Sequence, residues 1–154
     1  MAYRIEGLDP EPFAGLFDLS DAELAARNAR RVRADSPTGH PCRVSLREAV
    51  EGEELLLINH VSNEAPTPFR AAHAIYVRKG AQTGRYADAV PPLFVSRTLS
   101  LRAFDRDGML RDGVLAGPGE ADAGIRALFE RDEIDTIHAH SAAYGCFLAR
   151  IERS

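Results

Sequence analysis

Hydrophobic and polar positions along the 154-residue chain follow two spacings, one typical of strands and one typical of helices. Four consecutive aliphatic residues, Leu55–Ile58, predict a central strand that is covered on both faces. Residues 72–78 predict a second strand, and residues 98–103 alternate as a half-buried strand does. The turn-forming stretch Asp105–Gly108 then predicts a hairpin that returns through residues 109–115.

Three segments carry the signals of short helices. Asp9-Pro10 is a typical helix start, and residues 13–17 place an apolar stripe behind it. The stretch Ser20–Glu23 has the sequence of a capping box and predicts a second helix that runs to about residue 27 or 29. Apolar residues spaced over 125–129 predict the buried face of a third helix.

The order of these elements indicates the fold class. Two helices come first, several strands follow, and only the last helix lies between strands, which disfavours a doubly wound parallel sheet. Turn-forming residues predict loops at 35–41, 62–69 and 80–92. We therefore expect one α+β domain over residues 1–154, with a mostly antiparallel mixed sheet of about six or seven strands and three short helices.

The last two predicted strands form a hairpin whose apolar pattern selects one register. A loop over Ser141–Gly145 would place His140 opposite Cys146, and opposite residues of an antiparallel pair share a face. The more polar face then carries Ile134, Thr136, His138, His140, Cys146, Leu148, Arg150 and Glu152. The apolar face carries Asp135 at its start, followed by Ile137, Ala139, Phe147, Ala149 and Ile151.

This register predicts how the end of the chain is stabilised. We expect Phe147 and Ile151 to lie in the core and to pack against Phe129 of the preceding helix. Truncation of a buried phenylalanine typically costs about 3–5 kcal/mol, so Phe147→Ala should lower the melting temperature sharply. His138→Ala should lower it only slightly if that histidine faces a pocket.

Composition and charge narrow the function classes. The formal net charge is −4 with a pI near 5.7, and the short basic stretch Arg27–Arg33 fits a solvated face or a strand edge. Binding to nucleic acid is therefore not expected. No apolar run approaches the length of a membrane helix, and the first residues lack the pattern of a signal peptide. We expect a cytoplasmic protein whose two cysteines, Cys42 and Cys146, are reduced, which excludes a disulfide scaffold and a four-thiolate zinc site.

The last hairpin is the main candidate for a functional site, because histidines two residues apart on a strand point to the same side. As a pocket for a small polar or anionic ligand or a partner, it would use His138, His140, Cys146 and Arg150, together with the loop residues His40 and Arg70. As a metal-dependent enzyme, it would hold a divalent transition metal through His138 and His140, with Cys146, His60, His73 or His40 as a further ligand. A purely structural or interaction domain is the third interpretation.

A second candidate lies at Thr38–Arg43, where Cys42 could act as a nucleophile beside Arg43 with His40 as its base. No acidic or amide residue is placed to orient His40, and no local signature of a cysteine hydrolase is present. The chain has neither a phosphate-binding loop nor a dinucleotide fingerprint, which argues against ordinary nucleotide enzymes. Four arginines on or near strands could line an anion pocket or form surface salt bridges: Arg70, Arg78, Arg97 and Arg102.

Four stretches of this sequence together resemble one bacterial protein family. They are Pro41-Cys42-Arg43-x-Ser45-Leu46, Leu55-Leu56-Leu57-x-Asn59-His60, Pro68-Phe69-Arg70, and the run from Ile137-His138-Ala139-His140 through Gly145-Cys146-Phe147 to Arg150 and Arg153. The family is domain of unknown function 1203. The resemblance implies a small stand-alone bacterial protein and carries no activity, cofactor or catalytic residue. The family more usually has glycine at the position of His73 and asparagine at that of Ser141, which argues against His73 as an essential ligand.

Overall fold

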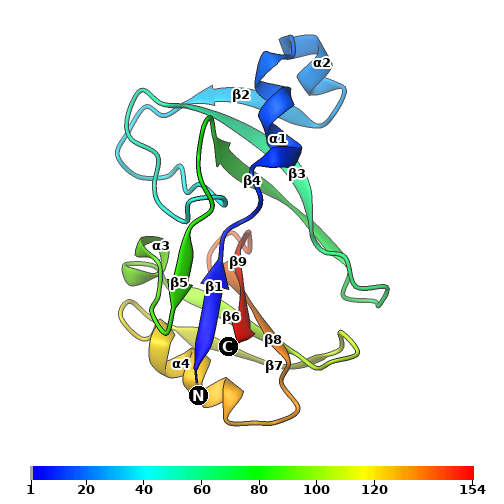
Figure 1. Ribbon diagram of the computed structural model, residues 1–154, viewed down its shortest axis with the longest axis vertical. Coiled ribbons are helices and arrows are strands. Elements are labelled where there is room, and N and C mark those ends of the chain that lie inside the picture. Colours follow the sequence, from blue (N-terminus) through cyan, green and yellow to red (C-terminus); the bar gives the residue numbers. More distant parts are fainter. Residues whose placement is uncertain (1) are drawn as a thin grey trace.

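A computed structural model describes residues 2–154. Within these residues the chain forms two antiparallel sheets, which lie one above the other along the long axis of the molecule (Figure 1). The lower part also holds Ala2 and Ser154, which are joined by a backbone hydrogen bond from the Ser154 N–H to the Ala2 oxygen. The predicted α+β class is therefore confirmed, although the strands form two sheets rather than one.

The larger sheet has six strands in the order β5-β1-β9-β8-β6-β7, and every neighbouring pair is antiparallel. Its strands are β1 (Tyr3–Glu6), β5 (Arg85–Ala87), β6 (Leu99–Phe104), β7 (Leu110–Ala116), β8 (Thr136–Ser141) and β9 (Phe147–Arg153). Because β8 lies between β6 and β9, its residues have strand neighbours on both sides.

The smaller sheet has three strands, β2 (Ala29–Arg33), β3 (Glu54–Asn63) and β4 (Ala71–Arg78), in that order. The run Leu55–Ile58 lies in the central strand β3, as its apolar sequence predicts. Leu56 and Ile58 point to one face, and Leu55 is buried on the other beside Ala34 and Ala49. The basic stretch at residues 27–33 contributes the edge strand β2.

The described residues form four short α-helices and one 3₁₀ helix. They are α1 (Glu11–Ala14), the 3₁₀ helix η1 (Gly15–Asp18), α2 (Asp21–Ala25), α3 (Pro92–Val95) and α4 (Ala121–Phe129). The capping box of α2 is present: the Ser20 hydroxyl accepts from the backbone N–H of Glu23, and the Glu23 carboxylate accepts from that of Ser20. This helix ends earlier than predicted, because Asn28 in the left-handed region turns the chain into β2.

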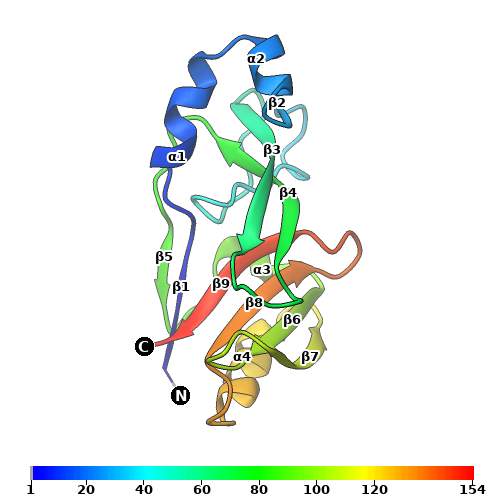
Figure 2. The same ribbon diagram turned by 90° about the vertical axis from the view of Figure 1, so that its right-hand side faces the viewer.

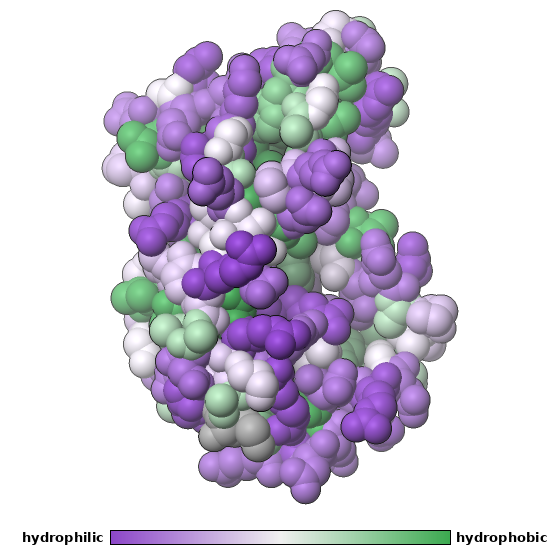
Figure 3. Space-filling view, viewed as in Figure 1, coloured by the Kyte–Doolittle hydropathy of each residue, from purple (hydrophilic) through white to green (hydrophobic). Residues whose placement is uncertain are grey.

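Two hydrophobic cores stabilise the two sheets. The first lies between one face of the six-stranded sheet and helices α3 and α4, where Phe94, Ile125 and Phe129 are buried. The second lies between the three-stranded sheet and the helices at the start of the chain, where Phe13, Phe17 and Leu24 are buried. Figure 3 shows that polar residues dominate this face of the molecule, with an apolar area over α1 and α2. None of the helices in residues 2–154 has the length and apolar character needed to cross a membrane.

Residues 2–154 form nine strands, more than the expected six or seven, because two short strands carry little pattern. Strand β1 is only four residues long, and β5 lies within the segment predicted as a loop at 80–92. Helix α3 also begins in that segment. Both strands depend on neighbours that are distant in the sequence, since β5 pairs with β1 and β1 pairs with β9.

The predicted facing of the last hairpin is wrong near its tip. Ala139 pairs with Ala149, but His140 pairs with Phe147, so Leu148 is the extra residue of a β-bulge. The bulge turns Leu148 into the core beside Ala149 and turns Phe147 onto the face of the histidines. Because Leu148 gains a place in the larger core, the bulge buries an aliphatic side chain that simple alternation leaves on the polar face. Of the predicted trio, Phe129 and Ile151 share that core and Phe147 does not.

The histidine face of the larger sheet is covered by the smaller sheet. Figure 2 shows the lower ends of β3 and β4 reaching down to β8 and β9. At this junction the rings of His73 and His140 lie 5.0 Å apart, and those of Phe69 and Phe104 lie 6.3 Å apart. The face predicted as the more polar one is therefore, at the histidines, an interior surface between two sheets.

Candidate functional site

His138 and His140 lie in the central part of β8 and are each only 4 % exposed. His138 packs between Phe104, at 4.8 Å between ring centroids, and Phe147, at 5.7 Å. His140 also contacts Phe147 at 5.7 Å. The two imidazoles share one face, as the alternation of a strand requires.

A hydrogen bond sets the tautomer of His140. Its Nδ1 lies 2.9 Å from the backbone oxygen of Gly145. A carbonyl oxygen only accepts hydrogen bonds, so Nδ1 carries the proton and Nε2 keeps its lone pair. The lone pair of Nε2 is then available as an acceptor or a base.

Burial keeps both histidines uncharged at neutral pH. Burial lowers the pKa of His138 to about 4, with further lowering by the positive charge of Arg150, by His140 and by Arg102. Burial also lowers the pKa of His140 to about 4, although its hydrogen bond to Gly145 acts in the opposite direction. The site therefore holds two neutral imidazoles with cationic arginines around them.

A cavity of about 190 Å³ opens beside the two histidines, between the sheets. It is lined by Ser62, Asn63, Phe69, Ala71, Arg102, Phe104, Leu110, His138 and His140. Arg102 lies on β6 directly opposite His138, and its Nε donates to the Ser100 hydroxyl at 3.3 Å. Within residues 2–154 its guanidinium has no carboxylate partner. The cavity thus combines aromatic and aliphatic walls with one uncompensated positive charge.

A second cavity of about 220 Å³ also borders His138. Its lining includes Arg150, which sits on β9 opposite His138, together with the carboxylates of Asp105 and Asp135. Arg150 donates to Glu152 at 2.7 Å, and its side chain is 54 % exposed. The predicted pairing of Arg150 with the histidines is therefore present, but its charge is already balanced by a carboxylate.

The other predicted site residues lie outside the histidine cavity. Cys146 is half-buried opposite Ser141 rather than His140, since its carbonyl accepts from the Ser141 N–H. Arg70 is exposed and donates to the backbone oxygen of Glu64. His40 packs on Tyr76, on the opposite face of β4 from His73.

The cysteine of the second candidate site is inaccessible. Cys42 is fully buried, and its sulfur accepts a hydrogen bond from the backbone N–H of Arg78 at 3.4 Å. The His40 ring faces Tyr76 and the carboxylate of Asp35, which lies 3.8 Å from its Nε2. Nothing in this arrangement gives a substrate access to the thiol.

Of the four arginines proposed for an anion pocket, two form ion pairs. Arg78 pairs with Glu53 at 3.2 Å, and Arg97 pairs with Glu48. Arg102 alone of the four lines the cavity of the histidines.

The metal hypothesis lacks a third ligand within residues 2–154, where no three His, Cys, Asp or Glu side chains form a group that could hold an ion. His60 lies opposite His73 in the β3–β4 ladder but packs on Phe13. His73 reaches the ring of His140, yet its Nδ1 lies 2.7 Å from the Ser62 hydroxyl. The contacts of His60 and His73 are therefore ring packing and a hydrogen bond rather than the arrangement of a shared metal site.

Arg43 holds the bulge of β9 in place. It is 3 % exposed, and its guanidinium donates to the backbone oxygen of Phe147 at 2.8 Å and to that of Pro41 at 2.6 Å. Burial lowers its pKa to about 10, which still leaves it charged at pH 7. Arg43 thus links the loop between β2 and β3 of the smaller sheet to β9 of the larger one.

We expect Arg43→Met to lower the free energy of unfolding by about 2–3 kcal/mol, because two buried carbonyls lose charged donors. Chemical denaturation monitored by circular dichroism measures this change. Arg47→Met is the matched control, since Arg47 is exposed and should change stability by less than about 0.5 kcal/mol. Equal effects of the two variants would contradict the role assigned to Arg43.

Most residues of the cavity are not identifiable from the sequence. The sequence predicts His73 only as a possible metal ligand, and it places Ser62, Asn63 and Phe69 in or beside a predicted loop. Arg102 appears only among arginines of uncertain role. The pairing of β6 with β8 brings Arg102 to His138, and strand order is not readable from local pattern.

Comparison with known proteins assigns the chain to a family. The model of the family DUF1203, described as a protein of unknown function, matches residues 39–153. This range includes the residues that line the cavity and the whole of the last hairpin. No curated protein and no solved structure matches the chain. The match extends over well more than half of the sequence and confirms the resemblance, and the chain therefore belongs to the DUF1203 family.

Proposed function

We propose that this protein binds a small organic acid in the cavity between the two sheets. The observation that supports this proposal is the guanidinium of Arg102, which lines the cavity and has no carboxylate partner within residues 2–154. Arg102 is half-buried, and a partly desolvated positive charge without a counter-ion gains from a carboxylate ligand that supplies one.

The cavity walls indicate the rest of the ligand. Phe69, Phe104 and Leu110 provide an apolar surface, and the neutral rings of His138 and His140 add sites for polar contacts. The volume of about 190 Å³ is smaller than the roughly 300–1,000 Å³ of drug-sized ligand pockets. A short carboxylic acid with an apolar tail fits this combination better than a sugar or a nucleotide.

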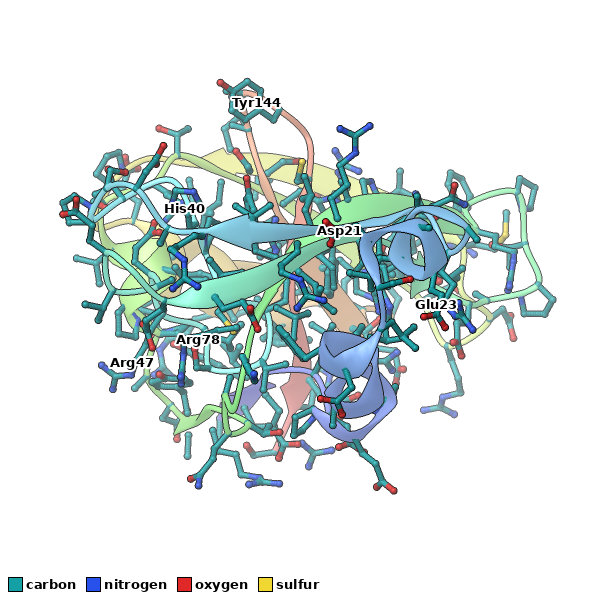
Figure 4. All side chains as sticks on the ribbon, turned by 90° about the horizontal axis from the view of Figure 1, so that it is seen from above. Asp21, Glu23, His40, Arg47, Arg78 and Tyr144 are labelled. Atoms are coloured by element: carbon teal, nitrogen blue, oxygen red, sulfur yellow. The ribbon has the colours of Figure 1, made fainter. Side chains whose placement is uncertain are left out.

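Isothermal titration with sodium butyrate at pH 7 tests this proposal. We expect Arg102→Met to weaken butyrate binding by about 10- to 100-fold, since a hydrogen bond to a charged group contributes about 1.5–3 kcal/mol. Arg47→Met, which alters an exposed arginine at the edge of the view in Figure 4, should leave the affinity unchanged. Absence of binding to the unaltered protein, or an equal loss in both variants, would overturn the proposal.

The proposal also names a compartment and a kind of partner. Cys42 and Cys146 are both free thiols, which suits the reducing cytoplasm. A small molecule rather than a nucleic acid or a membrane is the proposed partner, in keeping with the net charge of −4.

A further inference from the structure

The cavity contains a serine and a histidine in direct hydrogen-bond contact. The Ser62 hydroxyl lies 2.7 Å from Nδ1 of His73, and Ser62 also lines the cavity. Ser62 is the extra residue of a β-bulge in β3, because Val61 pairs with Ala72 and Asn63 pairs with Ala71. Bulges redirect a side chain out of the regular alternation and are frequent next to active sites.

The hydrogen-bond geometry indicates where the hydroxyl proton points. The backbone oxygen of Ala71 is also within reach of the Ser62 hydroxyl, but at 3.4 Å it is the much longer contact. The short contact places the Ser62 hydroxyl to donate to the lone pair of His73 Nδ1 in the tautomer that carries its ring hydrogen on Nε2. Burial, with the positive charges of Arg102 and Arg43, lowers the pKa of His73 and keeps it neutral at pH 7.

We propose that Ser62 and His73 form a nucleophile and general-base pair that hydrolyses a small carboxylic ester in this cavity. The inference rests on the proposed function, because the acid released by such a reaction is the kind of ligand proposed for Arg102. A nucleophile and a base within hydrogen-bond distance are the first requirement for acyl transfer, and both are present.

The steps balance with water as the second substrate. The Ser62 oxygen attacks the ester carbonyl carbon while its proton passes to His73 Nδ1, and the alcohol leaves with that proton. Water then attacks the acyl group on Ser62, gives one proton back through His73, and releases the carboxylic acid with the free serine. The net reaction is an ester plus water giving an acid plus an alcohol.

Arg102 is placed to stabilise the negative charge of this reaction. It lines the same small cavity as Ser62, so its guanidinium can donate to the oxyanion that forms on the carbonyl oxygen. The same group then binds the product carboxylate. Phe69, Phe104 and Leu110 provide the apolar surface for the acyl chain.

The pair depends on the Ser62 bulge, whose neighbour Asn63 is held by hydrogen bonds to Phe69 and Ala65.

Covalent labelling with diisopropyl fluorophosphate tests the nucleophile directly. The serine oxygen displaces fluoride from phosphorus, and HF is released. Intact-protein and peptide mass spectrometry should show one diisopropylphosphoryl group on Ser62, with no label in Ser62→Ala and at least tenfold slower labelling in His73→Gln. Ser96→Ala is the matched control that should label normally, since Ser96 is exposed and does not line the cavity. Labelling at another residue, or no labelling, overturns the inference.

Hydrolysis of p-nitrophenyl acetate provides the second measurement. Release of nitrophenolate should fall at least a hundredfold in Ser62→Ala, and free imidazole should restore part of the rate in His73→Gly. Equal rates in the unaltered protein and in Ser62→Ala overturn the inference. Butyrate binding by Ser62→Ala separates the two proposals: if it persists and depends on Arg102 while labelling fails, acid binding stands and ester hydrolysis falls.

Discussion

Replacing Phe147 with alanine is expected to lower the free energy of unfolding by about 3–5 kcal/mol, and the melting temperature by roughly 6–20 °C. The side chain is 2 % exposed and lies against the rings of both His138 and His140. Its removal would leave a cavity between the two sheets, which relax only in part around such a space. Differential scanning calorimetry measures the change.

Tyr144→Ala is the matched control for this variant. Tyr144 belongs to the same hairpin but is 91 % exposed and points outward at its tip (Figure 4), so its loss should change stability by less than about 0.5 kcal/mol. His138→Ala should also destabilise, by roughly 1–3 kcal/mol, because His138 packs between Phe104 and Phe147 rather than facing solvent. A Phe147→Ala protein as stable as the unaltered one would contradict the packing of the two sheets through this residue.

Folding stability is expected to fall as the pH is lowered from about 6.5 to 4. The pKa of His138 and of His140 is about 4 in the folded protein, below the value of 6.5 for a free imidazole. The unfolded chain therefore binds protons more readily in this range, and protonation favours unfolding. Each histidine should contribute a loss of about 3 kcal/mol by pH 4, with full stability above pH 6.5.

The double variant His138→Gln with His140→Gln isolates this effect. Its unfolding free energy, measured in urea at half-unit steps of pH, should vary much less between pH 6.5 and 4 than that of the unaltered protein. The change of unfolding free energy with pH decides the outcome, because the substitutions themselves alter the absolute stability at every pH. An unchanged slope would show that the two imidazoles titrate alike in the folded and unfolded chains.

The sequence by itself determined the features that depend on near neighbours. The capping box at Ser20–Glu23, the central strand over Leu55–Ile58 and the hairpin around Asp105–Gly108 all form as predicted, because each is stabilised by residues a few positions apart. The α+β class followed from the order of these elements. The pairing of His138 and His140 on one face also followed, since strand alternation alone requires it.

The tertiary structure alone decided what surrounds those histidines. A bulge at Leu148 turned Phe147 toward them, a second bulge at Ser62 opened the contact with His73, and strand order brought Arg102 opposite His138. Each of these depends on contacts across the two sheets, and the residue at which a β-bulge shifts the register is not marked by the local alternation. The face that is polar in the sequence became interior because a second sheet covers it, and that contact joins His73 and His140, which are 67 positions apart.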